Sequence, residues 1–252
     1  MNFQDTQLIG VLARAESTVS SLSSLLGGLV EKFAARGYSL YLVGGSVRDA
    51  LLGRLGNDLD FTTPARPEVV KEILDEWAET VWDTGIDFGT VSAAYKGQQI
   101  EITTFRSDSY DGQSRNPEVV YGDTLEGDLV RRDFKANAMA IELLADASFK
   151  FHDPLHGLQD IADRVLDTPD KPEISFHDDP LRMLRAARFA SQLEFRVADR
   201  VVEAMRDMAG EIQRITVERV QVELDKLICG TAPWDGIDLL VSTGIADYIF
   251  PE

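Results

Sequence analysis

The chain has few of the features that mark disulfide-bonded, membrane-spanning or secreted proteins. Its 252 residues include one cysteine, Cys229, so a disulfide bond within the chain is excluded and we expect the reducing cytoplasm. Cys229 itself is expected to be a core residue near a helix end. No apolar run approaches the roughly 18 residues of a membrane span. The N-terminus lacks a basic start followed by an apolar stretch, so we expect no secretory signal.

Positive charge is also scarce. Lys and Arg number 25 against 43 Asp and Glu, which gives a formal net charge of −18. This balance argues against a protein that coats nucleic acid non-specifically, because such a protein needs a basic surface. It does not exclude nucleic acid at one local patch, and arginine is concentrated in residues 182–206.

Common nucleotide and metal motifs are missing. No Gly-Lys-Ser/Thr follows Gly44-Gly45, so this pair is not a Walker A loop, and the dinucleotide fingerprint G-x-G-x-x-G is absent. The three histidines, His152, His156 and His177, form neither a metal set nor the His-Asp pair of a phosphohydrolase. The sequence therefore offers no residues for a hydrolase.

The hydrophobic pattern predicts a mixed α and β part followed by an all-helical part. Helices are expected over 7–36, 46–53 (with Ser46 as a candidate N-cap) and 66–80. Strands are expected over 38–43, 57–63 and 137–144, with a hairpin in 89–105 that turns at Lys96-Gly97. The polar residues 106–124 are expected to form a long loop. Further helices are expected over about 175–193, 197–211, 216–229 and 234–243, after a boundary near residue 170.

Two aspartates, Asp58 and Asp60, lie on the expected strand 57–63. Side chains at i and i+2 of a strand share a face, so these carboxylates converge. Mg²⁺ would relieve their repulsion, because it prefers carboxylate oxygens together with substrate phosphates. Glu101 would complete a two-metal phosphoryl-transfer site if its strand pairs with 57–63. The alternative is that all three are solvated carboxylates on exposed strand positions.

Gly44 and Gly45 follow the first expected strand and precede a helix. A helix N-terminus with accessible N–H groups binds phosphate, and Arg48, one turn into the helix, is a candidate for a charge-assisted contact. The alternative is a tight turn without a ligand. Phosphates at Gly44-Gly45, near a metal on Asp58 and Asp60, are what nucleotidyl transfer from a triphosphate requires.

The glycine pair, Arg48 and the two aspartates fall within the first of five ordered motifs that resemble those of class II tRNA nucleotidyltransferases. That family comprises the CCA-adding enzymes and their relatives the bacterial poly(A) polymerases, in the polymerase β-like superfamily. The motifs are LVGGSVRDALLG with Asp58-Leu59-Asp60, RRDFKANAMA (131–140), DPLHGLQDIADRVLDT (153–168), DDPLRMLRAARFA (178–190) and ERVQVELDKLI (218–228). Lys135 stands where Thr is commoner, and Asp178 stands where Glu is usual.

The resemblance implies an α+β protein with a polymerase β-like nucleotidyltransferase head, a small mixed sheet with helices, followed by an all-helical neck. We expect an N-terminal helical extension over 1–37, the head over 38–170 and the neck over 171–252, with the active site between head and neck. Family members are longer, so we expect helical body and tail domains to follow this N-terminal portion.

The resemblance also implies roles for residues of the head. Asp58 and Asp60 would ligate Mg²⁺, and Gly45 and Arg48 would contact the incoming triphosphate. Arg132 would contact the nucleotide from the second motif, and Asp133 would brace that loop.

In the neck, Asp179 and Arg182 would read the Watson–Crick edge of the incoming base, and Arg185 and Arg188 would help to hold the nucleotide. Positions 179 and 182 are i and i+3 on the expected helix and so share a face, and an acceptor beside a fork of donors suits C and A better than G and U. We expect Arg219 and Glu223, at i and i+4, to pair within the next helix.

The implied reaction is template-independent addition of CCA to tRNA 3′ ends from CTP and ATP, with Mg²⁺ as cofactor and pyrophosphate as leaving group. One alternative is an RNA 3′-adenylyltransferase, either a poly(A) polymerase or an A-adding enzyme. The long loop 106–124 favours an ability to add A, because CC-only relatives are shortened there. Another alternative is a non-catalytic RNA-binding module, against which the intact Asp58, Asp60 and Arg182 argue.

Overall fold

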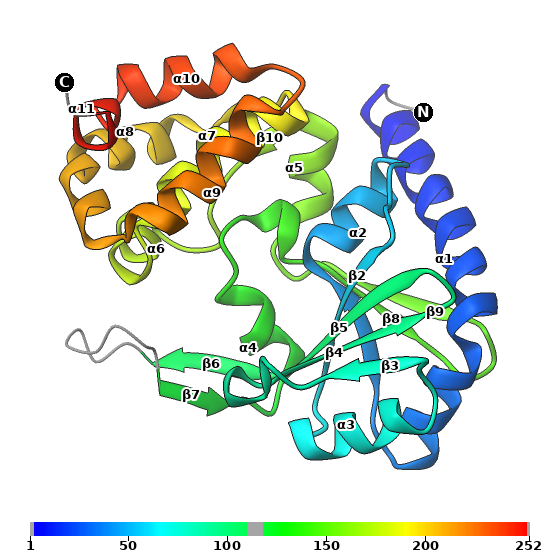
Figure 1. The fold of residues 1–252 in the computed structure, drawn as a ribbon. Helices are drawn as coiled ribbons and strands as arrows, with labels where there is room; N and C mark the ends of the chain where they lie inside the picture. Colours follow the sequence, from blue (N-terminus) through cyan, green and yellow to red (C-terminus); the bar gives the residue numbers. More distant parts are fainter. Residues whose placement is uncertain (1–2, 110–117, 251–252) are drawn as a thin grey trace. The chain divides into compact units, whose positions relative to one another are not determined.

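The computed structural model describes residues 3–109 and 118–250 (Figure 1). The chain forms two compact units, one up to Arg132 with Ala136–Ala162, the other Asp133–Lys135 with the residues from Asp163 onward. The expected extension 1–37 thus belongs to the first unit, and the second begins before residue 171. Among the described residues, no helix is both long and apolar enough to cross a membrane.

The first unit is built on a seven-stranded mixed sheet with the order β3-β4-β5-β2-β1-β8-β9. Its strands are β1 (Leu40–Val43), β2 (Asp58–Thr63), β3 (Thr80–Trp82), β4 (Thr90–Tyr95), β5 (Gln98–Thr104), β8 (Ala140–Leu143) and β9 (Phe149–His152). β2 runs parallel to β5, and the other neighbouring strands are antiparallel. Lys96 and Gly97 both have positive φ at the β4–β5 turn, as two-residue hairpins require. The expected α+β class with a mixed sheet is confirmed.

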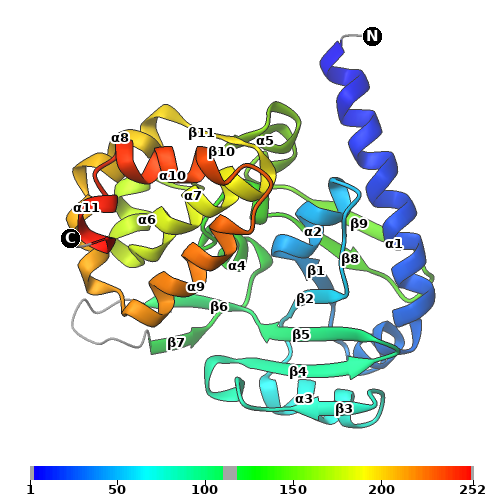
Figure 2. The same ribbon diagram turned by 45° about the horizontal axis from the view of Figure 1, so that its top comes forward.

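Five α-helices and a short 3₁₀ turn accompany this sheet. They are α1 (Phe3–Ala35), α2 (Gly44–Leu51), α3 (Pro67–Asp75), η1 (Ile86–Phe88), α4 (Leu125–Val130) and α5 (Gly157–Asp163). α1 packs against α2 and α3 (Figures 1 and 2). Leu26, Leu29 and Phe33 of α1 are fully buried, because residues three and four apart line one side of a helix. The first helix is therefore part of the hydrophobic core.

The alternation of side chains along β2 sets up the candidate site. Leu59 and Phe61 are buried, whereas Asp58 and Asp60 are exposed on the opposite face. The neighbouring strand β5 alternates in the same way, and the register pairs Asp60 with Glu101. The carboxylates of the two strands are therefore neighbours on one face of the sheet.

The prediction of a single loop over 106–124 was wrong. Strand β6 (Arg106–Ser109) pairs antiparallel with β7 (Glu118–Tyr121) in a separate two-stranded sheet. The centre of the expected loop, 110–117, lies outside the described residues. These strands are short and mostly polar, so they lack the alternation that marks a strand in sequence.

The second unit is mainly helical, as expected. It contains α6 (Pro172–Asp178), α7 (Leu181–Leu193), α8 (Asp199–Asp207), η3 (Ala209–Arg214), α9 (Val217–Ile228), α10 (Pro233–Ser242) and α11 (Ala246–Ile249), with a short parallel pair of β10 (Val165–Leu166) and β11 (Arg196–Val197). The 3₁₀ turn η2 (Lys135–Asn137) lies where the chain returns to the first unit. α7 packs against both α9 and α10.

The predicted single helix over 175–193 is interrupted between α6 and α7. Asp179 has an extended backbone, with φ −142° and ψ 100°. The following residue is Pro180, and the residue before a proline is disfavoured in the helical region. The break therefore has a local cause that the sequence contains.

The prediction that Cys229 belongs to the core was wrong, because its side chain is exposed. The buried residues of α9 are Glu223 and Leu227, four positions apart on one face of the helix. Position 229 follows Leu227 by two residues, which turns it away from that face.

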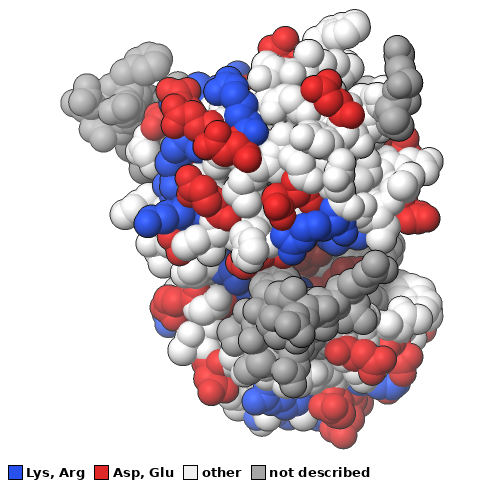
Figure 3. All heavy atoms as spheres, turned by 90° about the vertical axis from the view of Figure 1, so that its left-hand side faces the viewer, with Lys and Arg blue, Asp and Glu red and all other residues white. Residues whose placement is uncertain are grey.

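Charged side chains of both signs are mixed on one face of the molecule. On the face shown in Figure 3, described Lys and Arg side chains lie among Asp and Glu. The arginines concentrated in 182–206 include Arg185, Arg188 and Arg200, each of which pairs with a carboxylate. The arginine-rich sequence therefore does not produce an equally strong local excess of positive charge.

Candidate active site

Strand β1 leads directly into α2, whose first residue is Gly44. The N-cap is Val43, which has no side-chain cap hydrogen bond, so the predicted N-cap role of Ser46 was wrong. The Ser46 hydroxyl instead accepts a hydrogen bond from the N–H of Asp60 at 2.9 Å and donates to the carbonyl of Asp58 at 3.3 Å. Ser46 thus fixes the start of α2 against the strand that carries both aspartates.

Gly44 allows other groups of the first unit to approach the backbone closely. Its φ is +66°, a conformation that glycine adopts without strain. A Cβ atom here would lie 2.8 Å from Arg132 Nη1 and 3.9 Å from Asp60 Oδ2. The structure therefore brings three predicted site residues, Gly44, Asp60 and Arg132, to one place.

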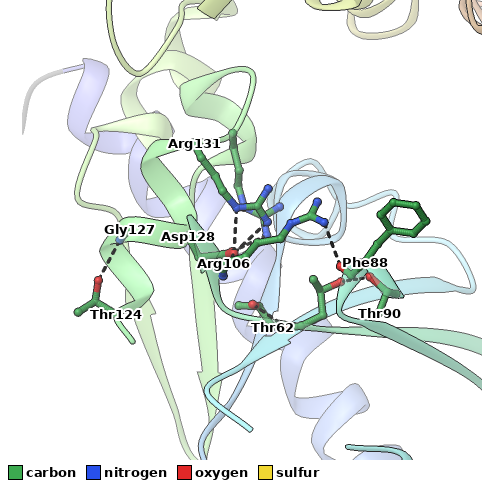
Figure 4. A network of polar contacts seen from close by, with 10 residues as sticks. Thr62, Phe88, Thr90, Arg106, Thr124, Gly127, Asp128 and Arg131 are labelled. Atoms are coloured by element: carbon green, nitrogen blue, oxygen red, sulfur yellow. Dashed lines mark hydrogen bonds and ion pairs between the residues drawn. The ribbon is translucent and has the colours of Figure 1, made fainter. Parts of the chain in front are cut away.

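The Arg132 side chain is held by a carboxylate that the sequence analysis missed. Its Nη2 donates to Oδ2 of buried Asp128 at 3.0 Å. Figure 4 shows Arg131 beside the same carboxylate, with Nε and Nη2 donating to Oδ1 at 3.1 and 2.9 Å. Thr124 caps α4 by accepting the N–H of Gly127 at 3.2 Å. An acidic residue three and four positions before two arginines was the available signal, because this spacing brings side chains together over one helical turn.

The environment of Asp128 keeps it ionised. Burial raises the pKa of its carboxyl, but the charges of Arg132 and Arg131, together with their hydrogen bonds, outweigh that effect and leave the pKa below its ordinary value. Asp128 is therefore a fixed negative charge at neutral pH.

The pKa of Asp60 is shifted in the opposite direction, above its ordinary value. The residue is exposed, yet the surrounding protein reduces the hydration of its carboxylate, which is the main reason that its pKa is raised. The negative charges of Glu101 and Asp58 raise the pKa further, and Arg132 and Arg48 partly oppose them. Negative charge is thus crowded at Asp60, and a bound cation would be favoured there.

The donor set fits a magnesium ion that is shared with a substrate. Mg²⁺ is commonly held by one or two carboxylates, with substrate phosphates and waters completing the octahedron. Asp58 and Asp60 supply such a pair. Within residues 3–109 and 118–250, no three His, Cys, Asp or Glu side chains converge so that they could hold a metal ion. Glu101 is a neighbour of Asp60 in the register, and its catalytic role stays a prediction.

Arg48 lies close to Gly45 but is engaged within the protein. Its guanidinium donates to Asn137 Oδ1 at 2.7 Å and to the two carboxylate oxygens of Asp49 at 3.0 and 2.9 Å. Its Nη2 lies 3.4 Å from the Cβ position at Gly45. These contacts give Arg48 a structural role in anchoring α2, and its contact with a triphosphate stays a prediction.

In the second unit, Asp179 and Arg182 are neighbours, although the prediction that they share one helix was wrong. Asp179 lies in the α6–α7 break, where Oδ1 accepts the N–H of Leu181 at 3.1 Å and Oδ2 pairs with Arg219 Nη2 at 3.0 Å. Arg182, in the first turn of α7, donates from Nη1 to Ser175 Oγ at 2.8 Å. Its N–H donates to the Asp179 carbonyl at 3.0 Å, which keeps the two residues within one turn.

The two remaining predicted arginines lie on α7 and pair with carboxylates. Arg185 Nε donates to Asp133 Oδ2 at 2.7 Å, and the negative charge of Asp133 raises the pKa of Arg185. Arg188 Nε lies 2.8 Å from Oε2 of buried Glu223. The prediction of an Arg219–Glu223 pair was therefore wrong, because Glu223 faces α7 while Arg219 reaches Asp179.

The chain enters the second unit for three residues directly after Arg132. Asp133 accepts the N–H of Phe134 at 2.9 Å, and the Phe134 ring meets the Phe189 ring edge-on with centroids 5.8 Å apart. Lys135, one of the two residues that depart from the family pattern, pairs with Asp167 at 2.6 Å. These contacts hold the second motif in place.

The mixed sheet, its paired aspartates and the glycine turn beside them define a nucleotidyltransferase head. Residues 40–167 match the family described as poly A polymerase head domain, and residues 194–252 match one described as a probable RNA and SrmB-binding site of polymerase A. The chain belongs to the family of class II CCA-adding enzymes and poly(A) polymerases.

Similar proteins include CCA-adding enzymes from two bacteria. That of Listeria innocua is 40% identical over 222 residues, which are 88% of this chain and 54% of that protein. That of Levilactobacillus brevis is 43% identical over 213 residues, which are 84% of this chain and 52% of that protein. This chain thus spans about half the length of these curated relatives.

Solved structures have the same fold. The CCA-adding enzyme of Bacillus stearothermophilus in complex with CTP superposes with a TM-score of 0.78 at 36% identity, covering 90% of this chain and 53% of that one. A tRNA nucleotidyltransferase complexed with a primer tRNA and an incoming ATP analog gives a TM-score of 0.74 at 26% identity, covering 92% of this chain and 62% of that one.

Proposed function

We propose that this chain contains the nucleotide-binding and catalytic residues of an enzyme that adds CCA to tRNA 3′ ends from CTP and ATP. The observation that carries the proposal is the convergence of Gly44, Asp60 and Arg132, with Asp58 two residues from Asp60 on the same strand face. Similarity to CCA-adding enzymes over most of the chain supports it.

In the reaction, the 3′-hydroxyl oxygen of the RNA forms a bond to the α-phosphorus as the bond to the leaving pyrophosphate breaks. Asp58 and Asp60 would hold Mg²⁺, which supplies positive charge to activate the hydroxyl and neutralise the leaving group. Arg132 and the start of α2 would bind the triphosphate, because a guanidinium and helix N–H groups both favour phosphate oxygens.

Asp179 and Arg182 would select the base. An ionised carboxylate has about four lone-pair sites and a guanidinium has five N–H donors. Asp179 could therefore accept from a base amino group while keeping Arg219, and Arg182 could donate to a ring nitrogen or carbonyl while keeping Ser175. This acceptor and donor set suits C and A, so selection would need no nucleic-acid template.

The test uses the full-length protein, a tRNA lacking its 3′ CCA, and each of the four NTPs alone and together, with the products sequenced. We expect CTP to add two residues and ATP to add one after them. Addition of A alone, or of a long A tract, would instead identify the adenylyltransferase alternative.

An Asp60→Ala variant serves as the control for the proposed metal site. It should lose addition while melting at the same or a higher temperature, because removing one carboxylate relieves repulsion at a crowded position. Normal turnover in this variant would remove the metal assignment.

A wild-type protein that binds tRNA but adds no nucleotide would support the alternative of a non-catalytic RNA-binding module.

A further inference from the structure

The carboxylate of Asp128 is fully buried and bonds to two arginines of one motif. Its side chain has 0% exposure, against 17% for Arg131 and 19% for Arg132. Oδ1 accepts two hydrogen bonds from Arg131, and Oδ2 accepts one from Arg132. One negative charge thus faces two positive charges, so the cluster keeps net positive charge.

The contact with Asp128 orients the Arg132 guanidinium. Nη2 bonds to Asp128 at 3.0 Å, whereas Nη1 is the atom that lies 2.8 Å from the Cβ position at Gly44. Within the described residues, the buried Nε of Arg132 has no hydrogen-bond partner. Asp128 therefore supplies the side-chain hydrogen bond that fixes which edge of the guanidinium faces Gly44 and Asp60.

The geometry points to Asp128 as a positioning residue for nucleotide binding. By holding Nη2 of Arg132, it presents Nη1 beside Gly44 and Asp60, where the phosphates of CTP or ATP lie under the proposed function. The inference rests on that function. Asp128 itself is buried and acts only through Arg132, so its effect should be the same for both nucleotides, which share their phosphates.

Asp128→Asn tests this role because it keeps the side-chain shape and removes the charge. In the full-length protein with Mg²⁺, we expect the Kd and the KM for CTP and for ATP to rise together by about tenfold, from loss of a charge-assisted hydrogen bond. The kcat should change less. Glu126→Gln, an exposed carboxylate on the same helix, is the matched control and should change neither constant.

A double-mutant cycle separates positioning from general stabilisation. If Asp128 acts through Arg132, then Asp128→Asn should weaken CTP binding little further in an Arg132→Ala background. An equal further loss there would overturn the inference. Arg132→Lys, which keeps Asp128 and the positive charge but loses the planar fork of donors, should also weaken CTP binding. Normal binding by this variant would overturn the inference even if Asp128→Asn does not fold.

Failure of the proposed function can be distinguished from failure of the inference about Asp128. Wild-type protein that neither binds CTP nor extends tRNA would remove that function together with the inference. Wild-type protein that does both, with Asp128→Asn indistinguishable from it, would remove the inference alone.

Discussion

Some residues of this chain have a structural role in addition to the role proposed for them in the reaction. Arg48 is the clearest example. It is 8% exposed and bonds to Asn137 and Asp49, so it anchors α2 whether or not a triphosphate is present. Arg182 differs, because it lies in the second unit, where its Nη1 donates to the hydroxyl of Ser175, and its proposed role is to read the base. Substitutions of Arg48 and Arg182 should therefore differ in their effects on base selection, triphosphate binding and melting temperature.

Arg182→Ala should impair base selection more than triphosphate binding. A site that hydrogen-bonds the right base rejects others by leaving buried polar groups unpaired, at about 1–3 kcal/mol per group. UTP and GTP should therefore compete with CTP better by roughly one to two powers of ten.

Arg48→Ala should instead weaken the binding of all four triphosphates together and lower the melting temperature. Measuring kcat/KM for the four NTPs checks both, and an Arg182→Ala enzyme that stays selective would place base reading elsewhere.

At the scale of elements, the β6–β7 hairpin separates the catalytic strands from the second motif. Its two strands are paired, and the backbone N–H of Arg106, at the start of β6, is 3.5 Å from Asp128 Oδ1. The Arg106 side chain donates to the Phe88 carbonyl at 3.1 Å (Figure 4). Arg106 thus attaches the start of β6 to both α4 and η1, and a change confined to residues 110–117 does not remove these contacts.

Replacing residues 110–117 with a two-residue Asn-Gly turn should leave C addition largely intact and impair A addition. The reason is the family resemblance, in which shortened segments accompany CC-only activity, together with the attachment of the hairpin base. An Asn-Gly turn suits a tight hairpin, so β6 and β7 should stay paired. The measurement is the product ratio with CTP alone, and then with ATP on a CC-ended tRNA. Equal loss of both activities would show that the tip is structural.

Much of the architecture could be predicted where local sequence decides it. The alternation of Asp58 and Asp60 with Leu59 and Phe61 places the carboxylates on one face before any tertiary contact is known. The break before Pro180 was equally local and could have been predicted.

Contacts between residues that are distant in the sequence could not be predicted in this way. The partners of Arg219 and Glu223 depend on how α9 is rotated against α6 and α7, because a helix offers each long side chain several acceptors. The positioning role inferred for Asp128 depends likewise on Gly44, which is far away in sequence. Spacing within one element did not contain this information.

At the scale of the whole molecule, the chain enters the second unit early, at residues 133–135, and returns there at Asp163. Asp167 links both parts of that unit. It accepts from Lys135 Nζ at 2.6 Å and from Arg200 Nε at 2.7 Å. Partial burial raises the pKa of Asp167, but the hydrogen bonds from Arg200 and Lys135 outweigh it and leave the pKa below its ordinary value.

Asp167 should therefore stabilise the fold in a pH-dependent way. A carboxyl whose folded pKa is depressed contributes stability fully above its unfolded pKa of about 4, and loses it as pH falls through the folded pKa. Asp167→Asn should lower the free energy of unfolding by about 1–2 kcal/mol at pH 7. The difference from wild type should shrink as the pH falls below the unfolded pKa and through the lower folded pKa, measured by thermal melts. Glu203→Gln, an exposed position on α8, is the control, and a difference independent of pH would contradict the linkage.

Cys229, the one cysteine among these 252 residues, is exposed at the end of α9 and gives this part of the protein a chemical handle. A maleimide dye on Cys229 labels the second unit at one defined position. A second cysteine at an exposed position of α3, for example Glu68→Cys, labels the first unit. Energy transfer between the two dyes then reports the distance between the units as CTP, ATP and tRNA are added in turn, so each step of the proposed cycle can be followed by fluorescence.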